Sequence, residues 1–417
     1  MEKQSEHLEG AALEAVRAKL SATQGPCVIK LGVDVHSAQY VVVAQWEHAT
    51  PRAAQRFLPQ AFVPWVEGLL GAGHEVHVVY EACGFGYGLQ RALVKAGARC
   101  LVIHPQRLDE VQCGVKTDPR DALTLCLRLG RYLDGNRHAL AVIRVPSEEE
   151  EQRRHVHRMR ESLVHHRTRL AAQGRGLLVN HGLPVPAHWW RGRGWNALGA
   201  LVPAWLMARL EVFRPVLAAL ETQIAALSAE LESAAPAGIP AGLGKLTTVI
   251  ATREVCDWQR FENRRQIASY TGLCPGEYSS GKKRVQGSVT KHGNGRLRAL
   301  LVELAWRMVR FQPGYPPVKA RLHILGPGHR ATGAARKKAI TAVARHLAIA
   351  LWRLFTGRAT AAQLGLRLNT SDTAELGELS QSGDRSHPGG PTTHEVTPDG
   401  TPESTPESTQ LTEGGLP

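Results

Sequence analysis

The sequence predicts an α/β domain, a helical connector, a mainly α-helical C-terminal domain and a disordered acidic tail, in that order. Three observations lead to this fold class. Short runs rich in Val and Ile alternate with helical stretches, long helical patterns follow them, and the last segment is rich in Ser, Thr, Pro, Gly and Glu. With 417 residues, the chain has room for two or three domains.

Four segments in the first part of the chain have the composition of buried β-strands. The first two follow each other directly, whereas a helical stretch ending in glycine precedes each of the other two. This order predicts a largely buried, partly parallel sheet, followed by a helix that begins at Asp118. The strand segments are CVIKLGVDVH, YVVVAQW, HEVHVVYEAC and ARCLVIHP.

Long helices follow the predicted sheet. The helix that begins near Ser147 is acidic in its first turn and basic afterwards, which suits the helix dipole. A later stretch repeats apolar residues every three or four positions and predicts a helical pair or short coiled coil. We therefore divide the chain into an N-terminal helix (1–26), an α/β domain (27–146), a helical connector (147–235), a C-terminal domain (236–360) and the tail (361–417).

The charge of the chain is unevenly distributed. The formal net charge is +14, but residues 371–417 hold nine acids and one base, so residues 1–370 carry +22. A folded body this basic favours nucleic acid as its partner. Seven scattered cysteines without a C-x-x-C motif argue against a zinc ribbon and indicate a reducing compartment. Without an apolar stretch of about 20 residues or a signal peptide, we expect a cytoplasmic protein with no membrane partner.

Four carboxylates occupy notable positions. Asp34 and Glu81 each end a predicted strand, while Asp118 and Asp121 lie three residues apart at a helix start and share a helix face. Gathered at one point they would need a cation between them. Mg²⁺ or Mn²⁺ suits such oxygen donors, and a two-metal site suits phosphodiester chemistry. An ordinary helix start with Pro119 in its first turn, and simple turn residues after strands, explain the same pattern without a metal.

A serine pair precedes a basic loop and a helix in GLCPGEYSSGKKRVQGSVTKHGNGRLRALL. Ser279 or Ser280 is a candidate nucleophile, with His292 as the nearby candidate base. The basic residues of the segment are candidates for binding phosphate groups. Taken alone, the segment also fits a surface turn with a solvated basic face. These basic residues are Lys282, Lys283, Arg284, Lys291, Arg296 and Arg298.

Two further features allow more than one interpretation. His155, His157, His165 and His166 lie on the basic helix without carboxylate or cysteine partners at ligand spacing, so we expect them to face solvent or RNA. The segment WWRGRGW, at 189–195, mixes tryptophan and arginine, a combination that stacks on bases or simply packs a connector.

Five segments in a fixed order resemble the DEDD transposases of the insertion-sequence one-ten family, which are related to Piv-type DNA invertases. The ordered set spans about residues 28–310. The resemblance implies an N-terminal RuvC-like domain with the RNase H fold, a coiled-coil connector, and a C-terminal transposase domain that carries a nucleophilic serine. The segments are GVDVHS, YEACGFG, KTDPRDA, IPAGLGKLTTVIA and FENRRQIASYTGLCPGEYSSGKKRVQGSVTKHGNGRLRALL.

The resemblance also implies roles for individual residues. Matched by motif, the nucleophile is Ser280, because the family keeps a serine directly before glycine, with Ser279 as the alternative. The family binds a noncoding guide RNA that bridges donor and target DNA, and assembles as a tetramer that combines the acids of one subunit with the serine of another. The sequence departs from the family in the segment TVIATREVCDW, which is more polar than the usual apolar helix there. The implied metal-binding acids are Asp34, Glu81, Asp118 and Asp121.

Together these features predict a transposase or site-specific recombinase that cuts and rejoins DNA through a phosphoserine intermediate with a divalent metal. Lys282, Lys283 and Arg284 are the expected groups for charge stabilisation. Alternatives are a metal-dependent nuclease of the Holliday-junction type, a Piv-like invertase, and a nucleic-acid-binding protein without catalytic activity.

Overall fold

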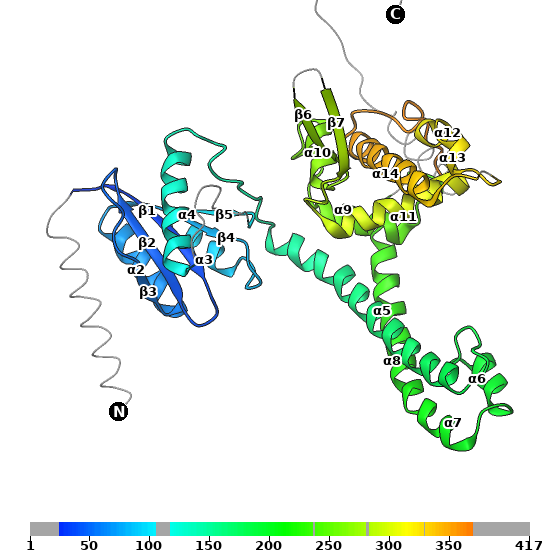
Figure 1. Cartoon of the computed structure of the whole chain (residues 1–417). Coiled ribbons are helices and arrows are strands. Elements are labelled where there is room, and N and C mark those ends of the chain that lie inside the picture. Colours follow the sequence, from blue (N-terminus) through cyan, green and yellow to red (C-terminus); the bar gives the residue numbers. More distant parts are fainter. Residues whose placement is uncertain (1–24, 106–116, 237, 281–282, 329, 370–417) are drawn as a thin grey trace, which may run out of the picture. The chain divides into compact units, whose positions relative to one another are not determined.

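The computed structural model describes residues 25–105, 117–236, 238–280, 283–328 and 330–369 (Figure 1). The chain divides into two compact units, Met1–Arg153 and Arg154–Pro417, called here the first and second units. Almost all of the predicted N-terminal helix lies outside the described residues, as does the tail from residue 370 onwards. None of the described helices combines the length and apolar character needed to cross a bilayer.

A mixed five-stranded sheet forms the centre of the first unit, in the order β3-β2-β1-β4-β5. Strand β1 pairs antiparallel with β2 and parallel with β4, and β4 pairs parallel with β5. The prediction of a partly parallel, largely buried sheet is confirmed. The short edge strand β3 was not predicted, because its three residues carry no apolar pattern. The strands are β1 (Val28–Val35), β2 (Tyr40–Trp46), β3 (Gln55–Phe57), β4 (Glu75–Glu81) and β5 (Arg99–Ile103).

Helices cover both faces of this sheet. Helices α2 (Pro59–Gly71) and α3 (Gly88–Ala96) lie on one face, where Leu31 and Val78 of the central strands are buried together with Phe62 of α2. Helix α4 (Asp118–Leu133) lies on the other face and begins at the predicted residue. The central residues of β1 are therefore buried on both sides, with Leu31 beneath α2 and α3 and with Lys30 and Gly32 on the face that α4 covers.

A glycine in β1 lets α4 approach the sheet closely. A Cβ atom on Gly32 would lie 2.2 Å from the carbonyl oxygen of Ala122 and 2.4 Å from the backbone nitrogen of Cys126, so only glycine fits. The Cys126 thiol also lies 3.3 Å from the carbonyl oxygen of Lys30. Because Ala122 contacts Gly32 and Cys126 contacts Lys30, α4 runs antiparallel to β1. The first turn of α4 therefore lies at the edge where β1 ends.

The second unit begins with a long helical arm. Helix α5 starts in the first unit and runs for 33 residues, and the chain returns through three further helices. Leu217, Ile224 and Leu231 are buried at seven-residue intervals along α8, and Arg160 of α5 donates a hydrogen bond to Ser228 of α8 over 2.7 Å. The helices are α5 (Glu148–Asn180), α6 (Gly192–Gly199), α7 (Ala204–Glu211) and α8 (Phe213–Ser233).

The rest of the second unit is a mainly α-helical domain, as predicted. It also contains a β-hairpin, formed by β6 and β7, which was not predicted. Helices α11 and α14 provide much of its core, including Leu304 and Leu347. The described elements are α9 (Lys245–Val255), α10 (Arg264–Tyr270), β6 (Pro275–Ser280), β7 (Lys283–Val289), α11 (Gly295–Phe311), α12 (Pro316–Lys319), α13 (Leu322–Leu325) and α14 (Gly333–Phe355).

Residues 361–369, assigned to the tail by composition, belong to this domain instead. Ala361 and Leu366 are buried in its core, and Leu368 forms a β-bridge with Pro240. The apolar residues of this short stretch pack into the domain, so the domain extends beyond the compositional boundary at residue 360.

Candidate active site

Two of the predicted acids lie on neighbouring strands at one edge of the sheet. Val33 of β1 pairs with Tyr80 of β4, and Asp34 and Glu81 are the next residues of these parallel strands. Val33 and Tyr80 belong to the core beneath α2 and α3. Since side chains alternate along a strand, Asp34 and Glu81 point to the other face, which α4 covers. Both acids are half-buried.

The other two acids lie in the first turn of α4, which begins at that same edge. Asp121 directly precedes Ala122, whose backbone contacts Gly32 of β1, and it is half-buried. Asp118 is exposed. The fold thus places all four predicted acids at the carboxyl ends of β1 and β4, a region called here the acid edge.

The donor chemistry of the acid edge fits Mg²⁺ or Mn²⁺, because these hard cations take carboxylate oxygens as ligands. Within the described part of the chain, however, no three His, Cys, Asp or Glu side chains are arranged closely enough to hold one metal ion. The backbone therefore brings the four acids to one edge, while their side chains do not enclose an ion in this arrangement. Residues 106–116, which connect β5 to α4, lie outside the described residues.

The two predicted serines lie at the end of an antiparallel hairpin formed by β6 and β7, called here the serine hairpin. Ser279 pairs with Arg284, and Ser280, the last residue of β6, pairs with Lys283. Lys282 lies outside the described residues. The pairing fixes Lys283 and Arg284 directly across from the serines in the backbone ladder.

The two serines face opposite sides of the hairpin because they are neighbours on one strand. Ser279 donates a hydrogen bond from its Oγ to Glu277 Oε1 over 2.8 Å. Ser280 shares its side of the strand with Tyr278, whose side chain is 78% exposed, opposite the exposed Val285. The structure therefore gives Ser279 a carboxylate partner and gives Ser280 an exposed aromatic neighbour.

The other predicted phosphate-binding residues have different surroundings. Arg296 forms an ion pair with Glu161 of α5, with 2.7 Å between Nε and Oε2. Arg298 donates through Nη1 to the carbonyl oxygens of Thr271 and Lys291, over 3.1 and 3.0 Å. Lys291 itself is exposed. Arg296 thus pairs with a residue of the helical arm. Arg298 stabilises the turn that follows the hairpin through its two hydrogen bonds.

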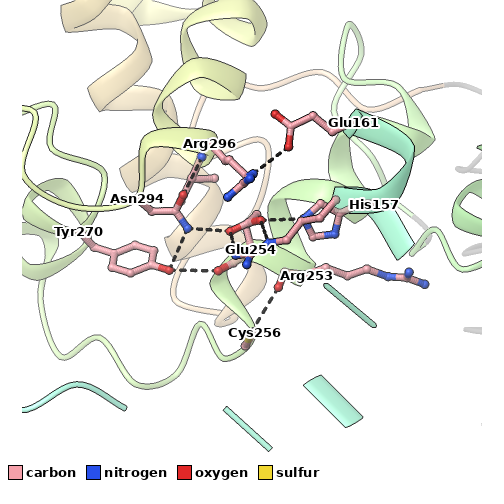
Figure 2. Close-up of polar contacts among 10 residues, drawn as sticks. His157, Glu161, Arg253, Glu254, Cys256, Tyr270, Asn294 and Arg296 are labelled. Atoms are coloured by element: carbon pink, nitrogen blue, oxygen red, sulfur yellow. Dashed lines mark hydrogen bonds and ion pairs between the residues drawn. The ribbon is translucent and has the colours of Figure 1, made fainter. Parts of the chain in front are cut away.

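The analysis of the sequence missed a buried carboxylate, that of Glu254 in α9 (Figure 2). Glu254 of α9 is 1% exposed and accepts hydrogen bonds from His157 Nε2 at 2.7 Å, Arg158 Nε at 3.0 Å and Asn294 Nδ2 at 2.8 Å. Burial by itself would raise the pKa of the Glu254 carboxyl. The hydrogen bonds from His157, Arg158 and Asn294 outweigh burial and hold this pKa far below its usual range, so the group is ionised.

The prediction that His157 faces solvent or RNA is wrong, because His157 is 3% exposed and bonded to Glu254. Tyr270 of α10 donates to the carbonyl oxygen of Glu254 over 3.0 Å. Asn294 caps α11 by accepting from the backbone nitrogen of Leu297. These contacts join α5, α9, α10 and the start of α11. We call Glu254, His157, Arg158, Tyr270 and Asn294 the Glu254 cluster.

The polar stretch TREVCDW was the one sequence signal of this cluster. This stretch is more polar than an ordinary buried helix because it contains Glu254. The Glu254 carboxylate is buried and accepts hydrogen bonds from Arg158 and Asn294. Its partners could not be identified from the sequence, since His157 lies 97 residues away and Asn294 lies 40 residues away along the chain.

Two family models match the chain. Residues 31–182 match a transposase model of the IS110 DEDD type, and this range contains all four acids. Residues 239–318 match the model described as the transposase IS116/IS110/IS902 family, and this range contains both serines.

Individual relatives agree with these matches. A protein of Sinorhizobium fredii named as a transposase is 31% identical over 306 residues, covering 66% of this chain and 76% of the relative. The chain belongs to the IS110 transposase family. A Pseudomonas aeruginosa protein named as a family 20 transposase is 30% identical to this IS110-family chain, covering 56% of it and 71% of the relative. The transposase for insertion sequence element IS1111A of Coxiella burnetii is 28% identical, over 56% of this chain and 66% of its own.

Membership of this family confirms the resemblance seen in the sequence motifs. A transposase family implies binding of DNA, cleavage of its strands and strand transfer. The four candidate acids and the two candidate serines all lie inside the ranges that match the family models.

Proposed function

We propose that this IS110-family chain is a DNA recombinase that cuts and rejoins strands through a serine ester, with a divalent metal ion at the acid edge. The observation that carries the proposal is that the fold brings four acids, scattered over 88 residues of sequence, to one edge of a buried sheet. If each acid were only a turn residue or a helix-start residue, nothing would require all four to lie at the same edge of the sheet.

In this proposal Asp34, Glu81, Asp118 and Asp121 hold Mg²⁺ or Mn²⁺. When bound, such a metal polarises the scissile phosphate and lowers the pKa of an attacking hydroxyl group. These four acids would hold the ion, and the buried strands below Asp34 and Glu81 limit how far these two carboxylates can move.

Ser280 is the proposed nucleophile. Its Oγ attacks the phosphorus atom of a DNA strand, an Oγ–P bond forms, and the bond from phosphorus to the 3′ oxygen breaks. The 3′ oxygen takes up a proton, and the 5′ side of the strand remains joined to the protein as a phosphoserine ester. Attack by another 3′ hydroxyl on this ester releases Ser280 and rejoins the strands. Lys282, Lys283 and Arg284 neutralise the developing phosphate charge.

Ser279 is the second candidate, and one contact favours it. Its hydroxyl already donates to Glu277, so this carboxylate is in position to take the proton that a serine must lose when it attacks. The motif match favours Ser280, and the hydrogen bond favours Ser279.

The further parts of the proposal concern the fold of the first unit, the helical connector, the RNA and the assembly. The strand order β3-β2-β1-β4-β5 supports an RNase H fold of the RuvC type for the first unit. The seven-residue spacing on α8 supports a coiled coil. We propose that a noncoding RNA selects donor and target DNA, and that a homotetramer combines the acids of one subunit with the serine of another. The charge of +22 on residues 1–370 suits both nucleic acids.

Trapping of the ester tests the proposal. The full-length protein, its copurified RNA and Mg²⁺ are incubated with donor DNA carrying a nick beside the cleavage site, so that a short strand is lost after cleavage and rejoining fails. On a denaturing gel, the wild type should give a labelled covalent protein–DNA adduct. Ser280→Ala should give none, while Ser279→Ala should keep it. The reverse result assigns the nucleophile to Ser279.

The same assay separates the rival functions. Cleaved DNA without any adduct in the wild type would indicate a nuclease that uses water, and would contradict the serine mechanism. Binding that persists with EDTA, with no cleavage at any metal concentration, would indicate a nucleic-acid-binding protein without catalytic activity. Recombination only between fixed inverted sites would indicate an invertase.

A further inference from the structure

A pocket of about 440 Å³ lies in the helical arm of the second unit, between α5 and the loop 185–190. Five lining residues come from a stripe along α5, and six come from the loop. This loop lies between the ranges 31–182 and 239–318 that match the family models, so the matches give it no role. The lining residues are Arg167, Thr168, Ala171, Ala172, Arg175, Val185, Pro186, Ala187, His188, Trp189 and Trp190.

The tryptophan that forms the back of the pocket is held in place by close packing. Trp189 is 2% exposed and donates from Nε1 to the carbonyl oxygen of Ala171 over 3.0 Å. A Cβ atom on Gly174 would lie 2.0 Å from its ring, so this glycine is what admits the ring against α5. His188, directly before Trp189, has a φ of 53°, in the left-handed region that costs a non-glycine residue energy.

The other loop residues are held from α8. Glu221 accepts a hydrogen bond from Trp190 Nε1 over 3.1 Å and forms an ion pair with Arg191 at 2.7 Å. The His188 and Trp190 rings meet edge to face, with 5.3 Å between their centroids. The aromatic wall is therefore built before any ligand arrives, which lowers the entropic cost of binding one.

The open side of the pocket carries positive charge. Arg167 and Arg175 lie eight residues apart on α5, about 12 Å along the helix axis, and Ala171 and Ala172 lie between them. The two alanines leave the space that the pocket occupies. An aromatic and apolar interior between two guanidinium groups matches the two parts of a nucleotide, a flat base and an anionic phosphate.

We propose that this pocket binds an unpaired nucleotide of an RNA strand, with the base against the His188 and Trp190 rings and phosphates at Arg167 and Arg175. Its volume lies in the range of pockets that enclose small ligands. Duplex DNA keeps its bases stacked and paired, whereas RNA loops present unstacked bases that proteins read on aromatic and arginine surfaces. The choice of RNA rests on the proposed guide RNA; the nucleotide chemistry rests on the pocket alone.

Filling the pocket tests this inference. Leu in place of the exposed Ala172 puts a larger side chain into the space without changing any charge. Gln173→Leu adds the same side chain at the neighbouring exposed position, which does not line the pocket. Binding of the full-length protein to a fluorescent single-stranded RNA of mixed sequence is measured by anisotropy in EDTA. We expect Ala172→Leu to weaken binding about tenfold and Gln173→Leu to leave it unchanged.

Charge reversal gives an independent comparison. Arg175→Glu should weaken RNA binding more than Arg169→Glu, since Arg169 is an exposed arginine of the same helix outside the pocket. Thermal unfolding midpoints of all four variants should stay close to that of the wild type. An RNA containing 4-thiouridine should crosslink to the peptide that holds residues 185–190, and Ala172→Leu should remove this crosslink.

The outcomes distinguish the pocket from the recombination mechanism. Unchanged RNA binding by Ala172→Leu, or an equal loss for duplex DNA, would overturn the pocket. An equal loss for single-stranded DNA of the same sequence would overturn the assignment to RNA. A wild type that binds no RNA would refute both this inference and RNA guidance. Because the assay contains no metal and no cleavable DNA, a missing serine ester would leave the inference intact.

Discussion

The acid edge and the serine hairpin position their chemical groups in opposite ways. Tyr80, directly before Glu81, is 1% exposed in the sheet core, whereas Tyr278, directly before Ser279, is 78% exposed on a two-stranded hairpin. The acids end buried strands covered on both faces. The serines end a strand that belongs to a two-stranded sheet, and both serines are exposed.

Under the proposed function, this difference follows from what each group must do. Carboxylates that hold a metal ion must be kept close together against their mutual repulsion, so a rigid buried sheet suits them. A nucleophile must reach the phosphate of a large, stiff substrate, so it must project from the surface. Elsewhere in the same domain, the Glu254 cluster joins four helices through buried hydrogen bonds.

Removing one acid should give the largest effect. Asp34→Asn keeps the size of the side chain and removes a negative ligand, so we expect DNA cleavage to slow by about a thousandfold, with little change in DNA binding or thermal unfolding. Single-turnover cleavage kinetics measure this. Asp134→Asn, at the exposed C-terminal end of α4, is the matched control and should cleave normally. Normal cleavage by Asp34→Asn would contradict a catalytic acid edge.

Removing the centre of the Glu254 cluster should give the next largest effect, on stability. Glu254→Ala leaves Arg158 and His157 without their buried counter-ion, and we expect a loss of about 3–5 kcal/mol in the unfolding free energy of the second unit. Glu161→Ala breaks the exposed pair with Arg296 and should cost about 0–1 kcal/mol. Urea unfolding measures both. Equal losses for the two variants would show that burial does not distinguish these ion pairs.

Disturbing the close packing of α4 on the sheet should have a smaller effect on stability. A methyl group at Gly32 collides with backbone atoms of α4, so Gly32→Ala should destabilise the first unit by about 1–3 kcal/mol and slow cleavage by moving the acids of α4. Gly68→Ala, inside α2 with open space around its Cβ position, should be neutral or stabilising by up to about 1 kcal/mol. If Gly32→Ala were as stable as the wild type, the close contact between Gly32 and the backbone of α4 would not be what positions α4 on the sheet.

The pH dependence of the second unit should show the smallest effect. The folded pKa of Glu254 lies below the ordinary value of 4.5, so its ionised form contributes stability that is fully present above pH 4.5. This contribution should decline as the pH falls below 4.5 towards the folded pKa. Unfolding midpoints of the wild type between pH 6 and pH 3.5 should therefore fall more steeply than those of Glu254→Gln. Parallel curves would show that the carboxylate is not the titrating group.

The extent of prediction from sequence differs between the two regions. Apolar strand segments and glycine-terminated helices were sufficient to predict the order of β1, β2, β4 and β5 and the start of α4 at Asp118. Positions at the ends of these elements then identified the acids. For the serine hairpin, the motif identified Ser279 and Ser280, but the hydrogen bond from Ser279 to Glu277 and the exposure of Tyr278 required the structure.

By itself, the sequence determined the four longer strands of the first unit and their order along the chain, the family and the candidate chemical groups, because these depend on local periodicity and short motifs. The tertiary structure alone decided which distant residues meet. Gly32 meets Ala122, Glu254 meets His157 and Asn294, and Trp189 enters the space left by Gly174. Such contacts depend on the packing of whole helices and strands against each other, and no local pattern in the chain encodes the partner on the other side.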